Sequence, residues 1–562
     1  MKKAISIGIQ GFSALREQDC FFVDKTNFIK EWWENRDVVT LITRPRRFGK
    51  TLNMSMLECF FSNKYANRAD LFEGLSIWQE EAYRKLQGSY PVIFLSFAAV
   101  KAGNLEDAKT QIKQEIARLY RENRNLMKED IFGEDERELY YQTTVKMDDV
   151  TAQDSLRNLS EWMEHYYGKK VIILLDEYDT PMQEAYVQGY WDEFTAFVRS
   201  LFNASFKTNP YLERAIMTGI TRVSKESIFS DLNNLQVITT TSDLYADCFG
   251  FTESEVFHVL DEFGMGDKKD EVKQWYDGFT FGEHKDIYNP WSITNYLDKR
   301  KTYPYWASTS SNGLVSRLIR TASADVKEKM EDLLNGREIV VSFDEQIVYN
   351  QLDHNENAIW SLLLASGYLK VKHVDYRGIT REPWYTLDIT NIETLSMFTT
   401  MFQDWFQNQD ANYGYFMKAL INGDLEAMNY YMNKVALATF SYFDVGSGNG
   451  SDPEPERFYH GFVLGLIAER AGIYEIRSNR ESGFGRYDIM MIPQEREKYP
   501  AIIIEFKVCS RMKKETLEEA VQSALDQIVD KNYDAELLSQ GIAADRIRHY
   551  GFAFEGKRVL IG

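Results

Sequence analysis

The chain has 562 residues, more than the roughly 250 to 300 residues at which a single hydrophobic core stops growing, so we expect several domains. Its composition, 44% hydrophobic and 27% charged, is typical of globular proteins and excludes wholesale disorder. The formal net charge of -20 excludes a protein that coats nucleic acid by charge alone, because such binding depends on Lys and Arg side chains that neutralise phosphates.

The cysteines and the apolar segments indicate the compartment. The four cysteines lie far apart and form no CxxC pair, which argues against a zinc site and against a disulfide framework. The apolar stretch near Met1 is too brief and too polar for a signal peptide, and the longest apolar runs suit buried strands and are too short to span a bilayer. We therefore expect a cytoplasmic protein without a membrane partner.

Residues 1–250 alternate short apolar runs with longer helical patterns. The apolar runs are residues 38–42, 91–97, 171–175 and 215–218. Such runs, separated by helices, are typical of a parallel sheet that is covered on both faces. The sequence therefore predicts an α/β domain in this part of the chain.

Residues 251–400 show helical periodicity and aromatic loops around Trp275 and Trp291, and we expect a mostly helical region. Aromatic residues of this kind lie in a core more often than in a ligand site, so we assign them no chemistry. A helix-like stretch then leads into two strand-like runs, residues 369–373 and 384–389. This order is typical of a small winged-helix-like unit.

Residues 401–562 form the third predicted domain. A polar stretch rich in Gly, Ser and Pro at residues 445–453 marks a flexible connection or the rim of an active site. After it the pattern runs from helix to strands and back to helix, which indicates a second α/β domain.

A phosphate-binding loop is predicted between the first apolar run and the helical pattern after it. Residues 43–51 read Thr-Arg-Pro-Arg-Arg-Phe-Gly-Lys-Thr, although Arg44 replaces the first glycine of GxxxxGK[ST]. Backbone amides at the start of the helix would cradle phosphate oxygens while Lys50 reaches the β and γ phosphates, and Thr51 would hold magnesium. The predicted nucleotide contacts in this loop are Arg46, Arg47, Phe48, Gly49, Lys50, Thr51 and Leu52.

A second half of the same site follows the apolar run at residues 171–175, which ends in Asp176 and Glu177. Asp176 is expected to hold the magnesium shell, and Glu177 to polarise the attacking water as a general base. The two halves together predict binding of ATP with Mg²⁺. A domain that binds the nucleotide without hydrolysing it stays an alternative because of Arg44.

These motifs resemble those of a bacterial AAA-ATPase-like family from Ile7 to about Leu235. The matching segments are residues 7–9, Phe12, and residues 23–26, 44–50, 175–181 and 218–224. In that family an arginine-rich loop replaces the first glycine. The resemblance implies that Thr218 acts as a polar sensor and that Arg222 senses phosphate charge, with an ordinary surface ion pair as the alternative for Arg222. It also implies that Gly8 and Phe12 line an adenine pocket, with a core position as the alternative for Phe12.

Two further apolar runs near the carboxyl terminus carry another set of polar residues. Asp488 lies on the run at residues 487–492, and a later run ends in Glu505, Phe506 and Lys507. Neighbouring strands would present Asp488, Glu505 and Lys507 at one edge, because alternate side chains of a strand share a face. Two carboxylates bind a hard divalent ion, and the lysine would orient a water or offset phosphate charge.

This second arrangement resembles the PD-(D/E)xK nuclease superfamily. The matching residues are Glu456, Tyr459, His460, residues 485–488, residues 505–507, residues 524–528 and Tyr533. The resemblance implies that Glu456 joins Asp488 and Glu505 in the metal shell and that Gln527 supports the site. An edge-strand ion pair between Glu505 and Lys507, or an inactive nuclease-like fold, stays an alternative.

The leading hypothesis is an ATP-binding ATPase coupled to a metal-dependent nuclease that cleaves phosphodiesters, with Mg²⁺ at both sites. A local basic patch, residues 511–514, would contact DNA or RNA, with a solvated helix start as the alternative. The rival hypothesis is a nucleotide-dependent switch or interaction protein with an inactive nuclease-like domain. Neither hypothesis requires a single chain, so an oligomer is compatible with both. The seven histidines show no metallopeptidase or zinc-finger spacing, so neither class is predicted.

Overall fold

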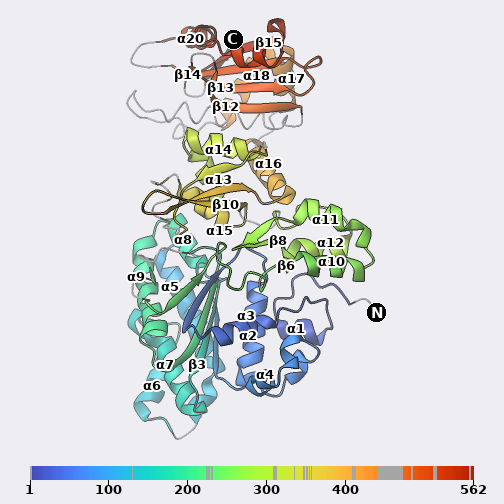
Figure 1. Cartoon of the computed structure of the whole chain (residues 1–562). Helices are drawn as coiled ribbons and strands as arrows, with labels where there is room; N and C mark the ends of the chain where they lie inside the picture. Colours follow the sequence, from blue (N-terminus) through green and yellow to red (C-terminus); the bar gives the residue numbers. More distant parts are fainter. Residues whose placement is uncertain are drawn as a thin grey trace. The chain divides into compact units, whose positions relative to one another are not determined.

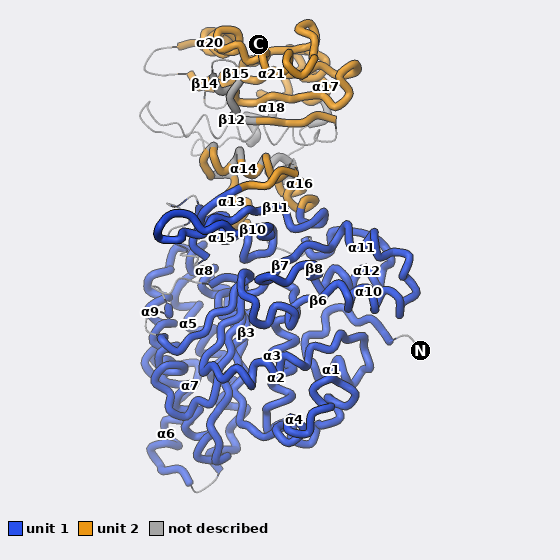
Figure 2. The backbone as a smooth tube through the Cα atoms, viewed as in Figure 1, with its two compact units in different colours: residues 1–310, 340–394 blue, residues 311–339, 395–562 orange. Residues whose placement is uncertain are grey.

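The computed structural model describes residues 3–128, 131–222, 228–229, 232–307, 313–334, 336–345, 349, 352, 355, 357–407, 413–439, 473–482, 485–509, 515–555 and 558–562. The chain divides into two compact units, residues 1–310 with 340–394 and residues 311–339 with 395–562 (Figure 2). None of the helices in these ranges is both long and apolar enough to cross a membrane.

The first unit is built on a five-stranded parallel sheet with the strand order β2-β3-β4-β1-β5. Its strands are β1 (Val39–Thr43), β2 (Val92–Ser96), β3 (Val171–Asp176), β4 (Leu212–Gly219) and β5 (Leu235–Ile238). Both β1 and β3 are buried along their whole length, as their continuous apolar sequence predicts for strands covered on both faces. The predicted α/β fold with a parallel sheet is confirmed.

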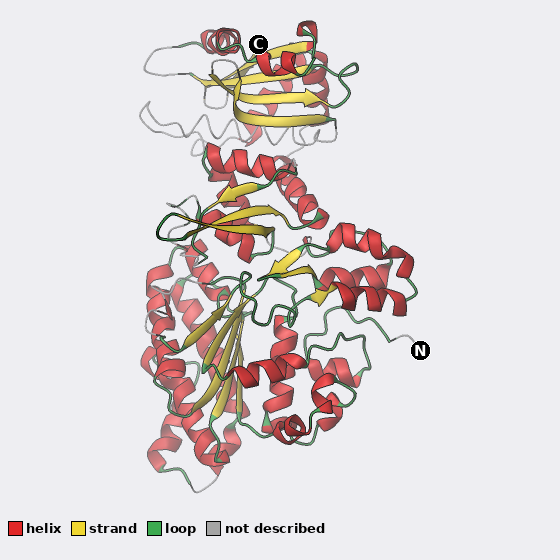
Figure 3. Ribbon diagram, viewed as in Figure 1, coloured by secondary structure: helices red, strands yellow, loops and turns green. Residues whose placement is uncertain are grey.

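Helices cover both faces of this sheet (Figures 1 and 3). The helices of this part of the chain are α1 (Phe12–Glu17), α2 (Asn27–Asn35), α3 (Lys50–Phe61), α4 (Glu81–Leu86), α5 (Leu105–Glu122), α6 (Glu134–Gln142), α7 (Asp149–Tyr167), α8 (Thr180–Gln188) and α9 (Trp191–Phe202). Side chains of α1, α2 and α3 share one core with Ile42, Ile172 and Ile216 of the sheet, whereas α5, α7 and α9 pack on one another. This arrangement leaves the carboxyl ends of the strands at one edge, where β1, β4 and β3 end side by side.

The middle region combines helices with two small sheets. The helices are α10 (Glu253–Glu262), α11 (Lys269–Tyr276), α12 (Pro290–Lys299) and α15 (Ala358–Ala365). One sheet has the order β6-β8-β7, with β6 (Phe251–Thr252), β7 (Phe279–Phe281) and β8 (His284–Tyr288), and the other has the order β10-β11-β9, with β9 (Ile339–Val341), β10 (Leu369–Arg377) and β11 (Glu382–Ile389). Helix α15 followed by the antiparallel pair β10 and β11 matches the predicted helix-then-two-strands order.

A buried carboxylate joins two parts of the middle region. Glu393 lies in the first turn of α16 (Ile392–Gln407) and is 0% exposed. Its carboxylate accepts hydrogen bonds from the Ser292 hydroxyl at 2.8 Å and from the backbone N–H of Trp306 at 2.6 Å. Burial raises the pKa of Glu393 to about 7, because removal from water penalises the charged form more than these donors favour it.

The second unit contains a mixed sheet with the order β12-β13-β14-β15-β16. Its strands are β12 (Tyr474–Ser482), β13 (Gly485–Pro493), β14 (Ala501–Val508), β15 (Ile547–Glu555) and β16 (Arg558–Ile561), and its helices include α13 (Gly313–Thr321), α14 (Ala324–Leu334), α17 (Tyr413–Asn422), α18 (Leu425–Thr439), α20 (Leu517–Asp530) and α21 (Asp534–Ser539). Only β14 and β15 pair in parallel. The predicted carboxy-terminal α/β fold is confirmed.

The two faces of this sheet pack against different helices. Ile502, Ile504 and Phe506 of β14 share a core with residues of α17 and α18, whereas Ile503 shares a core with Ile528 of α20. Because side chains alternate along a strand, Glu505 and Lys507 fall on the same face as Ile503. The two polar residues of β14 therefore face α20.

Glu393 predicts a specific pH dependence of stability. Its pKa is raised to about 7 in the folded protein from an ordinary value of 4.5, so its contribution to the free energy of unfolding is complete below pH 4.5 and is lost as the pH rises through 7. Glu393→Gln keeps the shape and one acceptor oxygen but does not ionise. We therefore expect the melting temperature of the variant, relative to that of wild type, to be higher at pH 8 than at pH 5. Thermal melts of both proteins at both pH values measure this gain, and a constant difference in midpoint would contradict it.

Candidate functional site

Residues 44–49 join β1 to α3 and form the predicted phosphate loop. Gly49, immediately before α3, has a φ of 80°, a left-handed conformation that glycine adopts without a steric penalty. The Lys50 ammonium donates hydrogen bonds to the backbone carbonyls of Arg44 at 2.9 Å and Pro45 at 2.8 Å. Burial lowers the pKa of Lys50, so an anionic ligand beside the ammonium would favour its charged form.

The loop contacts the tip of β3 directly. The Thr51 hydroxyl donates a hydrogen bond to one oxygen of Asp176 at 2.7 Å, and the Thr218 hydroxyl donates to the other oxygen. Asp176 is buried, and burial raises its pKa. A hydroxyl and a carboxylate in contact at the end of a phosphate loop are the oxygen ligands that Mg²⁺ prefers, so these side chains fit a nucleotide-bound magnesium ion.

Glu177 lies at the turn after β3. Its φ of 51° is in the left-handed region, which costs a non-glycine residue ~1–3 kcal/mol. Its carboxylate accepts a hydrogen bond from the Thr180 hydroxyl at 3.1 Å, and its backbone N–H donates to the Thr218 hydroxyl at 3.4 Å. The turn therefore places the proposed general base next to the polar sensor.

Arg44 has a structural role that explains the missing glycine. The guanidinium is 0% exposed and donates hydrogen bonds to the backbone carbonyls of Thr43 at 3.0 Å and Thr239 at 2.6 Å. It also lies 4.5 Å from the centroid of the Phe281 ring. Burial lowers the pKa of Arg44 to about 9, which leaves it charged at neutral pH. A large side chain at this position thus joins the end of β1 to the segment after β5.

The rest of the loop is held by the middle region, which the sequence did not indicate. The backbone carbonyl of Arg46 accepts hydrogen bonds from the indole of Trp306 at 3.0 Å and from the side-chain amide of Asn289 at 3.3 Å. The guanidinium of Arg47 lies 4.3 Å from the centroid of the Trp291 ring. The interpretation that assigned Trp291 no chemistry did not anticipate this cation–π contact.

Two predicted contact residues are buried phenylalanines. Phe48 is 1% exposed and packs edge-on against Phe279 and Phe281, so a nucleotide contact from Phe48 is restricted to its backbone. Phe12 is 0% exposed and stacks on Phe72 with ring centroids 5.2 Å apart. Phe12 therefore occupies the core, which is the alternative to the adenine-pocket position that the resemblance implied.

Arg222 follows the polar sensor segment. It lines a small cavity together with Thr43, Thr239 and Glu345. Within the described part of the chain Arg222 forms no ion pair, so the surface ion pair considered as an alternative is not seen there. The carboxylate in this cavity, Glu345, accepts hydrogen bonds from the hydroxyls of Thr239 and Thr241.

The carboxy-terminal residues meet at the edge of β13 and β14. The register pairs Ile489 with Ile504, so Asp488 and Glu505 are the next residues along the two strands. Asp488 accepts a hydrogen bond from the backbone N–H of Phe506 at 2.7 Å. Glu505 is 2% exposed, and burial, aided by the charge of Asp488, raises its pKa to about 8.

One oxygen of Glu505 is an orphaned acceptor. Its Oε2 is buried and has no hydrogen-bond partner among the described residues, whereas Oε1 accepts from Gln527 and lies 3.5 Å from the Lys507 ammonium. An unpaired buried carboxylate oxygen beside a second carboxylate is costly in a folded protein, and a divalent cation would satisfy it. The residues present therefore fit the predicted metal.

Gln527 of α20 holds the two polar residues of β14. Its amide donates to Glu505, and its carbonyl oxygen accepts from Lys507 at 2.6 Å. This geometry agrees with the supporting role that the resemblance implied for Gln527. The predicted ligand Glu456 and the basic segment at residues 511–514 lie outside the described residues.

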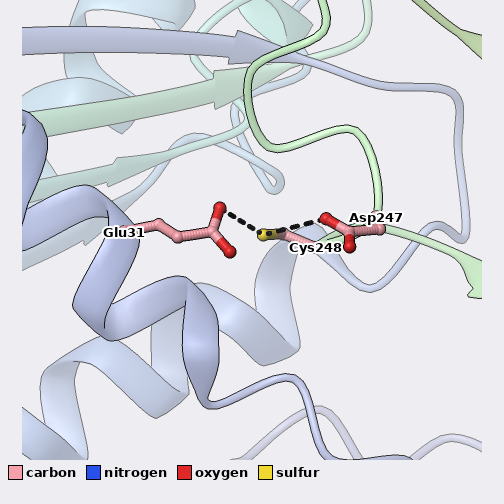
Figure 4. A group of neighbouring side chains, drawn as sticks. All are labelled: Glu31, Asp247 and Cys248. Atoms are coloured by element: carbon pink, nitrogen blue, oxygen red, sulfur yellow. Dashed lines mark hydrogen bonds between the residues drawn. The ribbon is translucent and has the colours of Figure 1, made fainter. Parts of the chain in front are cut away.

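Glu31 of α2, Asp247 and Cys248 form a group of possible metal ligands that is held by hydrogen bonds. The Cys248 thiol lies 3.4 Å from the Glu31 carboxylate and 3.9 Å from that of Asp247 (Figure 4). Burial raises the pKa of both Cys248 and Glu31, which favours a thiol that donates a hydrogen bond over a thiolate that binds a metal. These groups satisfy one another without an ion.

Comparisons with known proteins agree with both sites. Residues 6–229 match the model of a family described as predicted AAA-ATPase, and residues 454–562 match that of the PD-(D/E)XK nuclease superfamily. An uncharacterized protein in the vnfD 5' region of Azotobacter chroococcum mcd 1 is 27% identical over 398 residues, which span 70% of this chain and 68% of the relative. The chain thus carries a predicted AAA-ATPase domain over residues 6–229 and a PD-(D/E)XK nuclease superfamily domain over residues 454–562.

Proposed function

We propose that this protein is an ATPase coupled to a metal-dependent nuclease that cleaves nucleic-acid phosphodiesters. The observation that carries the nucleotide half is the 2.7 Å hydrogen bond between Thr51 and Asp176, because it brings the phosphate loop and the acidic strand end within reach of one ion. The observation that carries the nuclease half is the orphaned oxygen of Glu505 next to Asp488.

In the first site the chain binds and orients the triphosphate. Backbone amides of the loop and of the first turn of α3 contact phosphate oxygens, and Lys50 exchanges its two carbonyl partners for them. Thr51 and Asp176 hold Mg²⁺, which would neutralise charge on the β and γ phosphates. Glu177 orients and deprotonates the attacking water, and Thr218 and Arg222 stabilise charge at the γ phosphate.

In the second site Asp488 and Glu505 hold a divalent ion, which would polarise the phosphodiester. Lys507 lies close enough to Glu505 to orient the water or to offset charge that develops on the phosphate. Gln527 positions both Glu505 and Lys507 from α20. Glu456 is proposed as a third ligand on the basis of the superfamily.

Several finer points stay predictions. They are the division at residues 1–250, 251–400 and 401–562, the cytoplasmic location, contact of the basic segment with DNA or RNA, and assembly into an oligomer. A nucleotide-dependent switch with an inactive nuclease-like domain is the second candidate function. Two contacts between the phosphate loop and the middle region favour it, namely Arg46 with Trp306 and Arg47 with Trp291. A change in the conformation of the loop would alter these contacts.

Lys50→Ala tests the phosphate loop. The buried Lys50 ammonium lies against the loop carbonyls of Arg44 and Pro45, so we expect its loss to lower the affinity for ATP with Mg²⁺ at least about 100-fold. Titration calorimetry measures this loss, and Lys146→Ala, the same change at an exposed lysine, is the control that keeps the affinity of wild type. Equal affinity of Lys50→Ala and wild type for ATP would contradict the proposal that this loop binds the nucleotide.

Glu177→Gln separates binding from hydrolysis. The amide keeps the size and an acceptor for Thr180 but loses the base, so we expect kcat for ATP to fall about 100- to 10,000-fold while the Kd for ATP changes little. Phosphate release and calorimetry give the two values. A variant that hydrolyses ATP as fast as wild type would show that another group activates the water.

Asp488→Asn tests the nuclease half. Loss of one carboxylate from the metal site is expected to reduce Mg²⁺-dependent cleavage of plasmid and single-stranded substrates about 100-fold or more. Asp530→Asn, at an exposed aspartate of α20, is the matched control. Equal cleavage by Asp488→Asn and wild type would contradict the proposed site, and cleavage by neither would favour the nucleotide-dependent switch.

A further inference from the structure

Asp179 is a buried carboxylate that none of the roles above uses. It lies between the end of β3 at Asp176 and the start of α8 at Thr180 and is 5% exposed. One of its oxygens accepts three hydrogen bonds, from the backbone N–H of Ile220 at 2.9 Å and from the N–H and the hydroxyl of Thr221, both at 2.8 Å. All three donors belong to the segment that follows β4.

The cost of burying this carboxylate is offset mainly by the hydrogen bonds from that one segment. Burial raises the pKa of Asp179, and the three donors of Ile220 and Thr221 oppose the shift, as does the charge of Lys50. Because an unpaired buried charge is costly, Asp179 stays where it is only while residues 220 and 221 stay in place. The position of one element therefore determines the position of the other.

Further contacts bind the two elements along their length. The backbone N–H of Tyr178 donates to the carbonyl of Thr218 at 2.9 Å, and the Tyr178 hydroxyl donates to the carbonyl of Thr221 at 2.7 Å. The approach is so close that a Cβ on Gly219 would lie 2.6 Å from Asp179 Oδ1. Thr221 also shares a hydrogen bond with the buried hydroxyl of Tyr349 at 3.1 Å. Residues 218–221 are thus fastened to the turn at 176–179.

The next residue in the chain is Arg222. Since its neighbour Thr221 is held by Asp179, the backbone from which the Arg222 side chain departs is fixed relative to Asp176. Arg222 lines its cavity with Thr43, the last residue before the phosphate loop, and forms no ion pair with a described residue. A cation held in advance near developing or bound charge needs little reorganisation when the anion arrives.

We propose that Asp179 is the positioning residue that fixes Arg222 for recognition of the γ phosphate, so that the site discriminates ATP from ADP. This inference rests on the proposed ATP binding. The two aspartates of this turn then have different roles. Asp176 holds the metal, and Asp179 holds residues 218–221, which precede Arg222. ADP lacks the group that Arg222 contacts, so the part of the loss that acts through Arg222 is confined to the triphosphate.

The test compares the affinities of ADP and of the slowly hydrolysed analogue ATPγS, both with Mg²⁺, by titration calorimetry of the full chain. We expect wild type to favour ATPγS. Asp179→Asn should lower the affinity for ATPγS about tenfold more than the affinity for ADP, as should Arg222→Ala. The double variant should lose no more of this preference than Arg222→Ala alone, because Asp179 acts through Arg222.

Two conservative changes keep the test decisive if Asp179→Asn does not fold. Thr221→Val removes the hydroxyl that donates to Asp179 and should lower the preference for ATPγS, whereas Thr221→Ser keeps the hydroxyl and should retain it. An unchanged preference in Asp179→Asn or Thr221→Val, or additive losses in the double variant, would overturn the inference while leaving the proposed function intact. Absence of nucleotide binding by wild type would overturn both.

Discussion

The hydrogen bond between the Thr51 hydroxyl and Asp176 determines what the first unit can do. It joins the first turn of α3 to the end of β3, although these elements are separated by 125 positions in sequence. The strand order places β4 between β1 and β3, and β4 contributes Thr218 to the same carboxylate. Because the carboxyl ends of parallel strands meet at one edge, three strands converge on one site without a long loop.

The phosphate loop depends on residues far from it. Arg44 uses a buried guanidinium to bind the segment after β5. The carbonyl of Arg46 is held by Asn289 and Trp306, and Trp306 is held in turn by Glu393. Glu393 stands at the start of α16, whose chain continues into the second unit. The conformation of the phosphate loop thus depends on hydrogen bonds that the middle region supplies.

The buried carboxylates of the two sites differ in how fully they are hydrogen-bonded. In the first, the carboxylates of Asp176 and Asp179 are met by hydroxyl and amide donors, so their cost is offset within the protein. In the second, Glu505 keeps one oxygen without a partner among the described residues although it is almost fully buried. The first arrangement maintains the shape of a site between binding events, and the second suits a cation that supplies the missing interaction.

The sequence by itself determined the parallel sheet, the phosphate loop, and the positions of Asp176 and Glu505, because continuous apolar runs and polar residues at their ends are local patterns. Strand alternation also predicted that Glu505 and Lys507 share a face. Only the tertiary structure decided the core position of Phe12, the role of Arg44, and the contacts of Asp179 with Thr221 and of Trp306 with Arg46. Residues 179 and 221 are 42 positions apart and residues 46 and 306 are 260 apart. Contacts over such separations arise when strands and loops pack, and no local periodicity encodes them.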